Sequence, residues 1–198
     1  MDLDASETAL LQDLFALLER CGLADPRAEA AFRLAARAHR GQTRSDGPPY
    51  LVHPLNAARI VLEEWGHPDV DLACAALLHD ALEDGPIAPA EVEAAAGPRV
   101  LRLVELLTKA PVPPEQKAER DRAYYAALQQ DPGARLVKAA DRLDNLRSLR
   151  TARWPVAKKR AYAEEALRDV LPAVREGWPR EAAILEALAR AALDECGP

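Results

Sequence analysis

Cysteine is scarce in this sequence. The three cysteines, Cys21, Cys74 and Cys196, lie far apart and form no C-x-x-C pattern. Such a set indicates neither a disulfide framework nor a cysteine-ligated zinc site. Cys74 stands inside the apolar run 72–78, so we expect it to be a small core residue.

Aromatic residues are also few, with two Phe, three Trp and four Tyr, whereas Ala and Leu are abundant. This balance favours helices over sheets. Hydrophobic residues make up 49% and charged residues 29% of the chain, which is typical of a folded globular protein. A length of 198 residues is enough for one domain with its own core.

Positive charge is in deficit, with 26 basic against 32 acidic residues and a net charge of -6. This argues against a general nucleic-acid-binding protein. An anionic nucleotide remains compatible, because a metal ion and a few local cations reverse the field. No apolar run reaches the length of a membrane span, and the acidic N-terminus lacks a signal sequence. We therefore expect a cytoplasmic protein with no membrane partner.

Helical periodicity dominates the rest of the chain. The loop 40–50, rich in glycine and proline, interrupts it. We expect helices over residues 6–21, 26–39, 53–65, 68–84, 89–95, 98–109, 115–130, 134–150, 155–176 and 179–195. The pattern predicts an all-α fold, a single-domain bundle of roughly eight to ten helices over 1–198. Its motifs lie at about 30–150, and helices at 155–195 complete it.

The segment His79-Asp80-Ala-Leu-Glu83-Asp84 ends the apolar helix predicted at 68–84. On a continuous helix its four polar side chains share one arc about 140° wide. Carboxylates and an imidazole on a buried face need compensation, and a divalent cation supplies it. The alternative is a charged helix end that reaches solvent. However, acidic residues oppose the macrodipole at a helix C-terminus.

Two further polar positions complete the constellation. His53 follows the loop, and Asp141 shares an arc about 60° wide with Lys138 and Asn145 on its helix. Taken singly, a structural histidine and a solvated helix face are the alternatives. Together, two imidazoles and two carboxylates suit Mn²⁺, with Zn²⁺, Fe²⁺ and Mg²⁺ as alternatives. His39 is a rival ligand that is equally able to cap its helix.

Four motifs occur in an order that resembles a known family. They are Ala38–Arg44 (AHRGQTR), Pro49–Pro54 (PYLVHP), Ala75–Asp84 (AALLHDALED) and Lys138–Arg147 (KAADRLDNLR). The set resembles the H…HD…D signature of HD-domain phosphohydrolases. It is most similar to the hydrolase domain of RelA/SpoT homologues and to the stand-alone small alarmone hydrolases.

The resemblance implies a metal centre and a reaction. It implies that one Mn²⁺ is bound by His53, His79, Asp80 and Asp141. Glu83 and Asp84 match the pair that positions and activates the attacking water, with their division into acid and base left open. The implied reaction removes the 3′-pyrophosphate of ppGpp or pppGpp to leave GDP or GTP.

The residues that contact the substrate are predicted partly from the family resemblance and partly from the chemistry of the side chains. The resemblance places Arg44 near the base and phosphates and Asn145 at the ribose. Lys138 and Arg142 are further candidates for phosphate binding, although Arg142 is equally suited to a structural ion pair. Two positions depart from the family pattern, Ser45 in place of a common Lys and Asp144 in place of a common His.

Because these departures lie on the substrate side, other functions stay open. One alternative keeps the site and changes the substrate to a nucleoside monophosphate or the 2′-phosphate of NADPH. Another is a non-catalytic sensor that binds a metal or nucleotide, and a third is a structural bundle without a metal. The intact Glu83-Asp84 pair favours an enzyme over a sensor.

Overall fold

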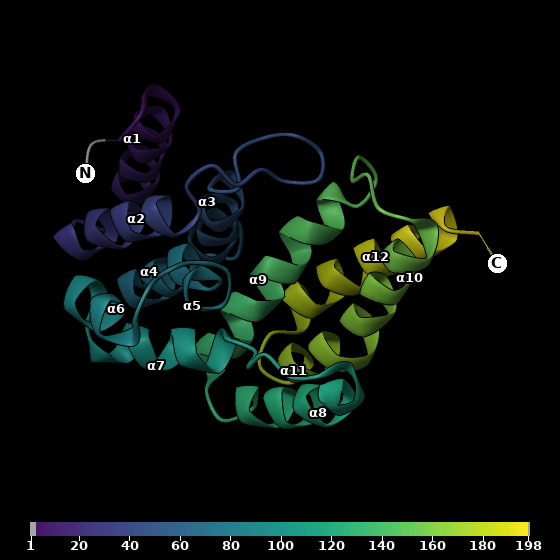
Figure 1. The fold of residues 1–198 in the computed structure, drawn as a ribbon. Coiled ribbons are helices and arrows are strands. Elements are labelled where there is room, and N and C mark those ends of the chain that lie inside the picture. The colour runs from purple at the N-terminus through teal and green to yellow at the C-terminus, as the bar shows by residue number, and fades with distance from the viewer. Residues whose placement is uncertain (1–2, 198) are drawn as a thin grey trace.

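The computed structural model describes residues 3–197 of the chain, which are mostly helical (Figure 1). The helices are α1 (Ala5–Arg20), α2 (Pro26–Ala38), α3 (Val52–Arg59), α4 (Val70–Leu78), α5 (Ala81–Asp84), α6 (Pro89–Ala96), α7 (Pro98–Leu107), α8 (Lys117–Leu128), α9 (Pro132–Ser148), α10 (Val156–Glu165), α11 (Leu171–Arg175) and α12 (Pro179–Glu195). Three short segments join them, the π-helical η1 (Ile60–Glu64) and η3 (Ala166–Val170) and the 3₁₀-helical η2 (Pro114–Gln116). Among residues 3–197, β pairing is limited to the single bridge between Thr43 and Pro49.

Local sequence signals explain where the main helices begin. Asp25 and Asp131 each precede a proline at the first helical position, and each aspartate accepts hydrogen bonds from backbone N–H groups of the first turn. Such caps satisfy donors that have no partner within the helix, while proline lacks the donor altogether. Asp69 caps α4 in the same way.

The core forms around α4, whose residues 72–78 are buried on all sides. This helix contacts α2, α3, α7 and α9. Helix α9 also contacts α11 and α12, so α9 lies between the N-terminal helices and the C-terminal ones (Figure 1). Polar residues on α3, directly after α4 and on α9 are thereby brought to one place. Cys74 is a buried core residue, as predicted.

The helix predicted over 68–84 is wrong in one respect. The structure has α4 end at Leu78 and α5 begin at Ala81, with a turn at His79–Asp80 between them. Gly85 ends α5 against α2, where an added Cβ would lie 2.7 Å from the Cβ of Ala38. The break redirects the side chains after residue 80, which periodicity on an unbroken helix cannot predict.

No helix within residues 3–197 is both long and apolar enough to cross a bilayer.

Candidate metal centre and its surroundings

Side chains from three parts of the chain converge in the core. His53 comes from α3, His79 and Asp80 from the turn between α4 and α5, and Asp141 from α9. The Nε2 atom of His53 lies 3.1 Å from Oδ1 of Asp141 and 3.2 Å from Nε2 of His79. The Nε2 atom of His79 lies 3.0 Å from Oδ2 of Asp80. Both imidazoles are 1% exposed, so bulk water does not compensate this arrangement.

The outer nitrogens of the two imidazoles define their chemistry. Nδ1 of His53 lies 2.7 Å from a carboxylate oxygen of Asp144, and Nδ1 of His79 lies 2.8 Å from the carbonyl oxygen of Ala76. Because both partners are acceptors, we infer that each Nδ1 carries a proton, so that Nε2 is the nitrogen at which each ring, when neutral, presents a lone pair. Two such lone pairs facing each other beside carboxylates form a donor set for a divalent cation.

The two carboxylates of the cluster are also held in place. The hydroxyl of Tyr50 donates to Asp80 at 2.5 Å. Lys138 Nζ and Asn145 Nδ2 each donate to Asp141 at 2.7 Å. The last two contacts confirm the prediction that residues 138, 141 and 145 share one side of α9. Tyr50 was not predicted as a partner, because its contact spans thirty positions of sequence.

The ionisation of the cluster fits a cation site. Burial opposes a charge on His79, but the carboxylates of Asp80 and Asp141 raise its pKa well above the ordinary value. Burial likewise opposes a charge on Asp141, but Lys138 and the two imidazoles hold its pKa well below the usual range. Without a metal the site therefore favours protonated histidine beside ionised aspartate. A divalent cation takes the place of those protons.

Among residues 3–197, one group of His, Cys, Asp and Glu side chains has ligand atoms all within 4.8 Å of one another, namely His53, His79 and Asp141. Asp80 joins it through its contact with His79. His39, the rival ligand, lies outside that group. It caps the end of α2, and its Nδ1 lies 3.0 Å from Oε1 of Gln42. The residues present fit a divalent metal.

Glu83 and Asp84 differ in their surroundings. Glu83 accepts a hydrogen bond of 2.9 Å from the backbone N–H of Lys109, the residue that follows α7 and Thr108. Burial and the nearby Asp80 carboxylate raise the pKa of Asp84. The sequence places both carboxylates after the His-Asp pair, but only the fold gives Glu83 its partner. A carboxylate with a raised pKa suits proton donation, and one held by a neutral donor suits proton acceptance.

The predicted substrate-side residues lie on or against α9. Arg44 donates to Asp144 at 3.0 Å, to Asn145 at 3.3 Å and to Ser148 at 2.9 Å. Arg142 is 2% exposed and pairs with Glu165 at 3.1 Å. The structural ion pair that the sequence left open for Arg142 is present in the fold, and a contact of Arg142 with substrate stays a prediction.

Lys109, Arg142 and Glu165 form a charged cluster (the Glu165 cluster), and Nζ of Lys109 and of Lys138 both lie over the ring of Tyr124. Lys109 Nζ lies 3.3 Å from Glu165 and 4.9 Å from the ring centroid of Tyr124. Burial lowers the pKa of Lys109 despite Glu165. Burial also penalises the charge of Glu165, but Arg142 and the hydroxyl of Tyr125 bring its pKa down to about 2. Sequence reasoning missed Lys109, because nothing local marks it as a neighbour of the site.

The low pKa of Glu165 predicts a pH dependence of stability. The pKa of its carboxyl is 4.5 in the unfolded chain and about 2 in the folded one, so the ionised group stabilises the fold above pH 4.5. That contribution is lost as the pH falls towards 2, and its full size is of the order of 3 kcal/mol. Urea unfolding of wild type and Glu165→Gln at pH 6, 4 and 3 measures it. We expect the gap between the two free energies of unfolding to shrink at the lower pH; a constant gap would contradict the ion pair.

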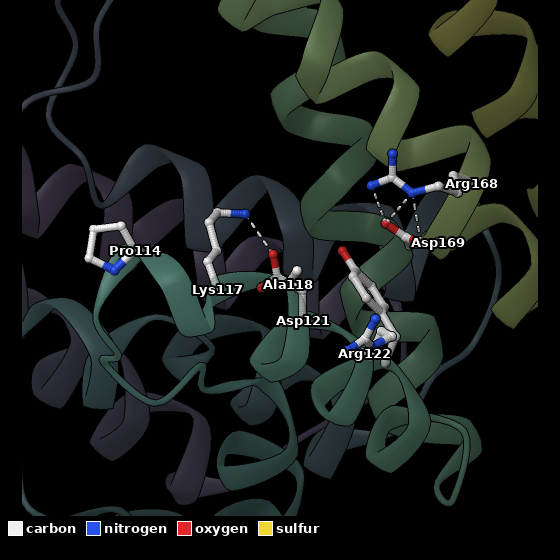
Figure 2. Close-up of a pocket in the computed structure, with 8 residues that line it drawn as sticks. Pro114, Lys117, Ala118, Asp121, Arg122, Arg168 and Asp169 are labelled. Carbon is white, nitrogen blue, oxygen red and sulfur yellow. Dashed lines mark hydrogen bonds and ion pairs between the residues drawn. The ribbon is translucent and has the colours of Figure 1, made fainter.

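A cavity of about 690 Å³ opens between α8 and η3 (Figure 2). It is lined by Pro114, Lys117, Ala118, Asp121, Arg122, Tyr125, Arg168 and Asp169. In Figure 2 Lys117 points to Asp121, and Arg168 to Asp169, at 2.7 Å or less in both pairs. The metal-centre residues do not line this cavity, which reaches the Glu165 cluster through Tyr125.

Comparison with known proteins identifies the fold and family. Residues 31–170 match the HD domain, which includes almost all of the motif-bearing core. A human protein named guanosine-3′,5′-bis(diphosphate) 3′-pyrophosphohydrolase MESH1 is 43% identical over 142 residues, covering 69% of this chain and 78% of that protein. A much longer Vibrio cholerae protein, also named guanosine-3′,5′-bis(diphosphate) 3′-pyrophosphohydrolase, is 37% identical over 158 residues, covering 76% of this chain and 22% of its own length.

A solved structure gives the same result. The structure described as "A metazoan ortholog of SpoT hydrolyzes ppGpp and plays a role in starvation responses" superposes with a TM-score of 0.72 at 29% identity. The match covers 88% of this chain and 97% of that one. The predicted resemblance and the predicted all-helical HD-type fold are both confirmed. This chain belongs to the HD-domain family of metal-dependent phosphohydrolases.

Proposed function

We propose that the chain hydrolyses ppGpp or pppGpp, releasing the 3′-pyrophosphate as the small alarmone hydrolases do. One observation carries the proposal: two imidazole nitrogens and two carboxylates face one point in the core, with Glu83 and Asp84 on the short helix that follows. The activity for which the human relative is named supports the choice of substrate, and this chain matches that relative over most of its length.

We propose that His53, His79, Asp80 and Asp141 hold one Mn²⁺. A divalent ion bound there supplies Lewis-acid chemistry, which lowers the pKa of a water and offsets charge on phosphoryl oxygens. The protein's own contribution is to fix the ligands. Nδ1–H of His53 and of His79 each donate outward, which keeps both Nε2 lone pairs directed inward.

The remaining steps belong to Glu83 and Asp84. The Lys109 amide holds one carboxylate oxygen of Glu83 and leaves the other to take the proton of the attacking water. Asp84, whose pKa is raised by burial and by Asp80, retains a proton more readily and gives it to the leaving oxygen. In-line attack at phosphorus needs positioning and charge neutralisation more than covalent chemistry.

Substrate contacts are proposed for Arg44, Lys138 and Asn145. Lys138 has a side chain 12% exposed and lies 2.7 Å from Asp141, so it supplies positive charge beside the metal centre. Arg44 and Asn145 hydrogen-bond each other at 3.3 Å and meet the nucleoside from one side. We also propose that residues 1–198 act as one hydrolase domain in the cytoplasm.

Product identification tests this function. The protein is incubated with Mn²⁺ and, separately, with ppGpp, pppGpp, nucleoside monophosphates and NADPH. We expect GDP and pyrophosphate from ppGpp and no orthophosphate. Orthophosphate from a monophosphate or from NADPH would favour the alternative substrates, which the departures at Ser45 and Asp144 keep open. No product from any of them would favour a sensor.

A further inference from the structure

Asp144 is a buried carboxylate that no step of the proposed reaction uses. It lies on α9 with 5% of its surface exposed. Its Oδ2 atom lies 2.7 Å from Nδ1 of His53 and 3.0 Å from Nη1 of Arg44. Its Oδ1 atom accepts from Asn56 at 3.0 Å. Three donors from two other segments therefore meet on one carboxylate.

We propose that Asp144 is a positioning residue that links the metal ligand His53 to the substrate-side cation Arg44. Only the metal centre of the proposed function enters this inference; the identity of the nucleotide does not. A histidine at this position would not offer a carboxylate with two acceptor oxygens. The aspartate at position 144, which departs from the family pattern, therefore has a structural consequence: it joins His53 and Arg44.

The contact with His53 fixes a tautomer. As acceptor, the carboxylate keeps the proton on Nδ1, so Nε2 is free to bind a cation. A carboxylate on the outer nitrogen also makes the imidazole a more basic ligand. His79 has only the neutral carbonyl of Ala76 in the equivalent place. The two imidazoles thus differ, and His53 is the one whose ligand strength depends on a charged partner.

The contact with Arg44 explains how a buried carboxylate is tolerated. Arg44 has a side chain 9% exposed, and its guanidinium balances the charge of Asp144. Its other terminal nitrogen reaches Ser148 at 2.9 Å. The loop 40–50 is thereby tied to α9, which orients Arg44 towards the same helix that carries Asp141. One carboxylate sets the geometry of a metal ligand and of a substrate cation.

Metal titration without nucleotide tests the inference. Affinity for Mn²⁺ is measured by competition with a chelator for wild type, Asp144→Ala, Asp144→Asn and Ser148→Ala. The alanine variant loses the acceptor and the charge, and we expect about 10- to 100-fold weaker binding. The asparagine variant keeps an acceptor oxygen, so we expect partial rescue, with binding about three- to tenfold weaker than wild type.

Ser148→Ala is the matched control, because it removes a contact of Arg44 and leaves His53 untouched. We expect it to bind Mn²⁺ as wild type does. The d–d absorption spectrum of the Co²⁺ form should change in Asp144→Ala and be largely restored in Asp144→Asn. If the alanine variant does not fold by circular dichroism, the asparagine variant decides.

Two outcomes would overturn the inference. One is Mn²⁺ affinity in the folded Asp144 variants equal to that of wild type. The other is a loss in Ser148→Ala as large as that in the Asp144 variants, which would place the effect in the Arg44 contacts. A protein that shows the expected dependence on Asp144 and yet leaves ppGpp intact would contradict the proposed function alone.

Discussion

Glu83→Gln is expected to lower the turnover of ppGpp by about 10²- to 10⁴-fold, the range that general-base catalysis contributes. The glutamine keeps a side-chain oxygen that accepts the hydrogen bond from the Lys109 amide, so its position is preserved. It cannot accept a proton from water. Mn²⁺ affinity should stay at the wild-type level, because Glu83 lies outside the group of ligand atoms.

The measurement pairs steady-state release of pyrophosphate with a metal titration on the same sample. Glu93→Gln, an exposed change on α6, serves as the control and should behave as wild type in both assays. Turnover within tenfold of wild type in Glu83→Gln would remove Glu83 from the reaction. A parallel loss of metal would instead make Glu83 a ligand.

Asp141→Ala is expected to abolish stoichiometric metal binding and hydrolysis together. It also leaves the ammonium of Lys138 buried without its carboxylate. Breaking a buried pair from one side costs about 3 to 5 kcal/mol of folding free energy, because an uncompensated charge remains. We therefore expect the metal-free variant to unfold at a clearly lower urea concentration than metal-free wild type.

The double variant Lys138→Met/Asp141→Ala separates the two effects. It removes the unpaired ammonium of Lys138, so much of the free energy of unfolding should be recovered in urea unfolding with chelator present. Metal binding should not return, since a ligand is still missing. Wild-type metal affinity in Asp141→Ala would contradict the ligand set. An unchanged unfolding midpoint would contradict the account of Lys138.

Local features of the fold were predictable from sequence, and long-range ones were not. The Asp-Pro pairs at 25–26 and 131–132 mark the starts of α2 and α9, because capping and proline act within one turn. The prediction placed the second start at 134. The π-helical segments η1 and η3 could not be predicted, because the helical pattern of the sequence continues through both of them.

In the candidate site, too, local features were predictable from sequence and long-range ones were not. The arc of Lys138, Asp141 and Asn145 was predicted correctly, because all three lie on one unbroken helix. The arc from His79 to Asp84 was not, because the chain turns at His79–Asp80 and Glu83 meets Lys109. Periodicity assumes an unbroken axis, and tertiary contacts decide where that axis ends.

Contacts between residues far apart in sequence were what the sequence predicted least well. Asp144 appeared in the sequence only as a departure from a family pattern, yet it lies 91 positions from His53 and within hydrogen-bond distance of it. Tyr50 and Lys109 likewise gained their roles from the fold. A sequence identifies residue types able to bind a cation, and the packing of α3, α4 and α9 decides which atoms of them meet.

The most direct test is a crystal structure of the protein grown with Mn²⁺ and collected at a wavelength where manganese scatters anomalously. We expect one strong anomalous peak per chain, enclosed by the Nε2 atoms of His53 and His79 and by carboxylate oxygens of Asp80 and Asp141. An absence of density between those atoms in a crystal that holds Mn²⁺ elsewhere would contradict the account.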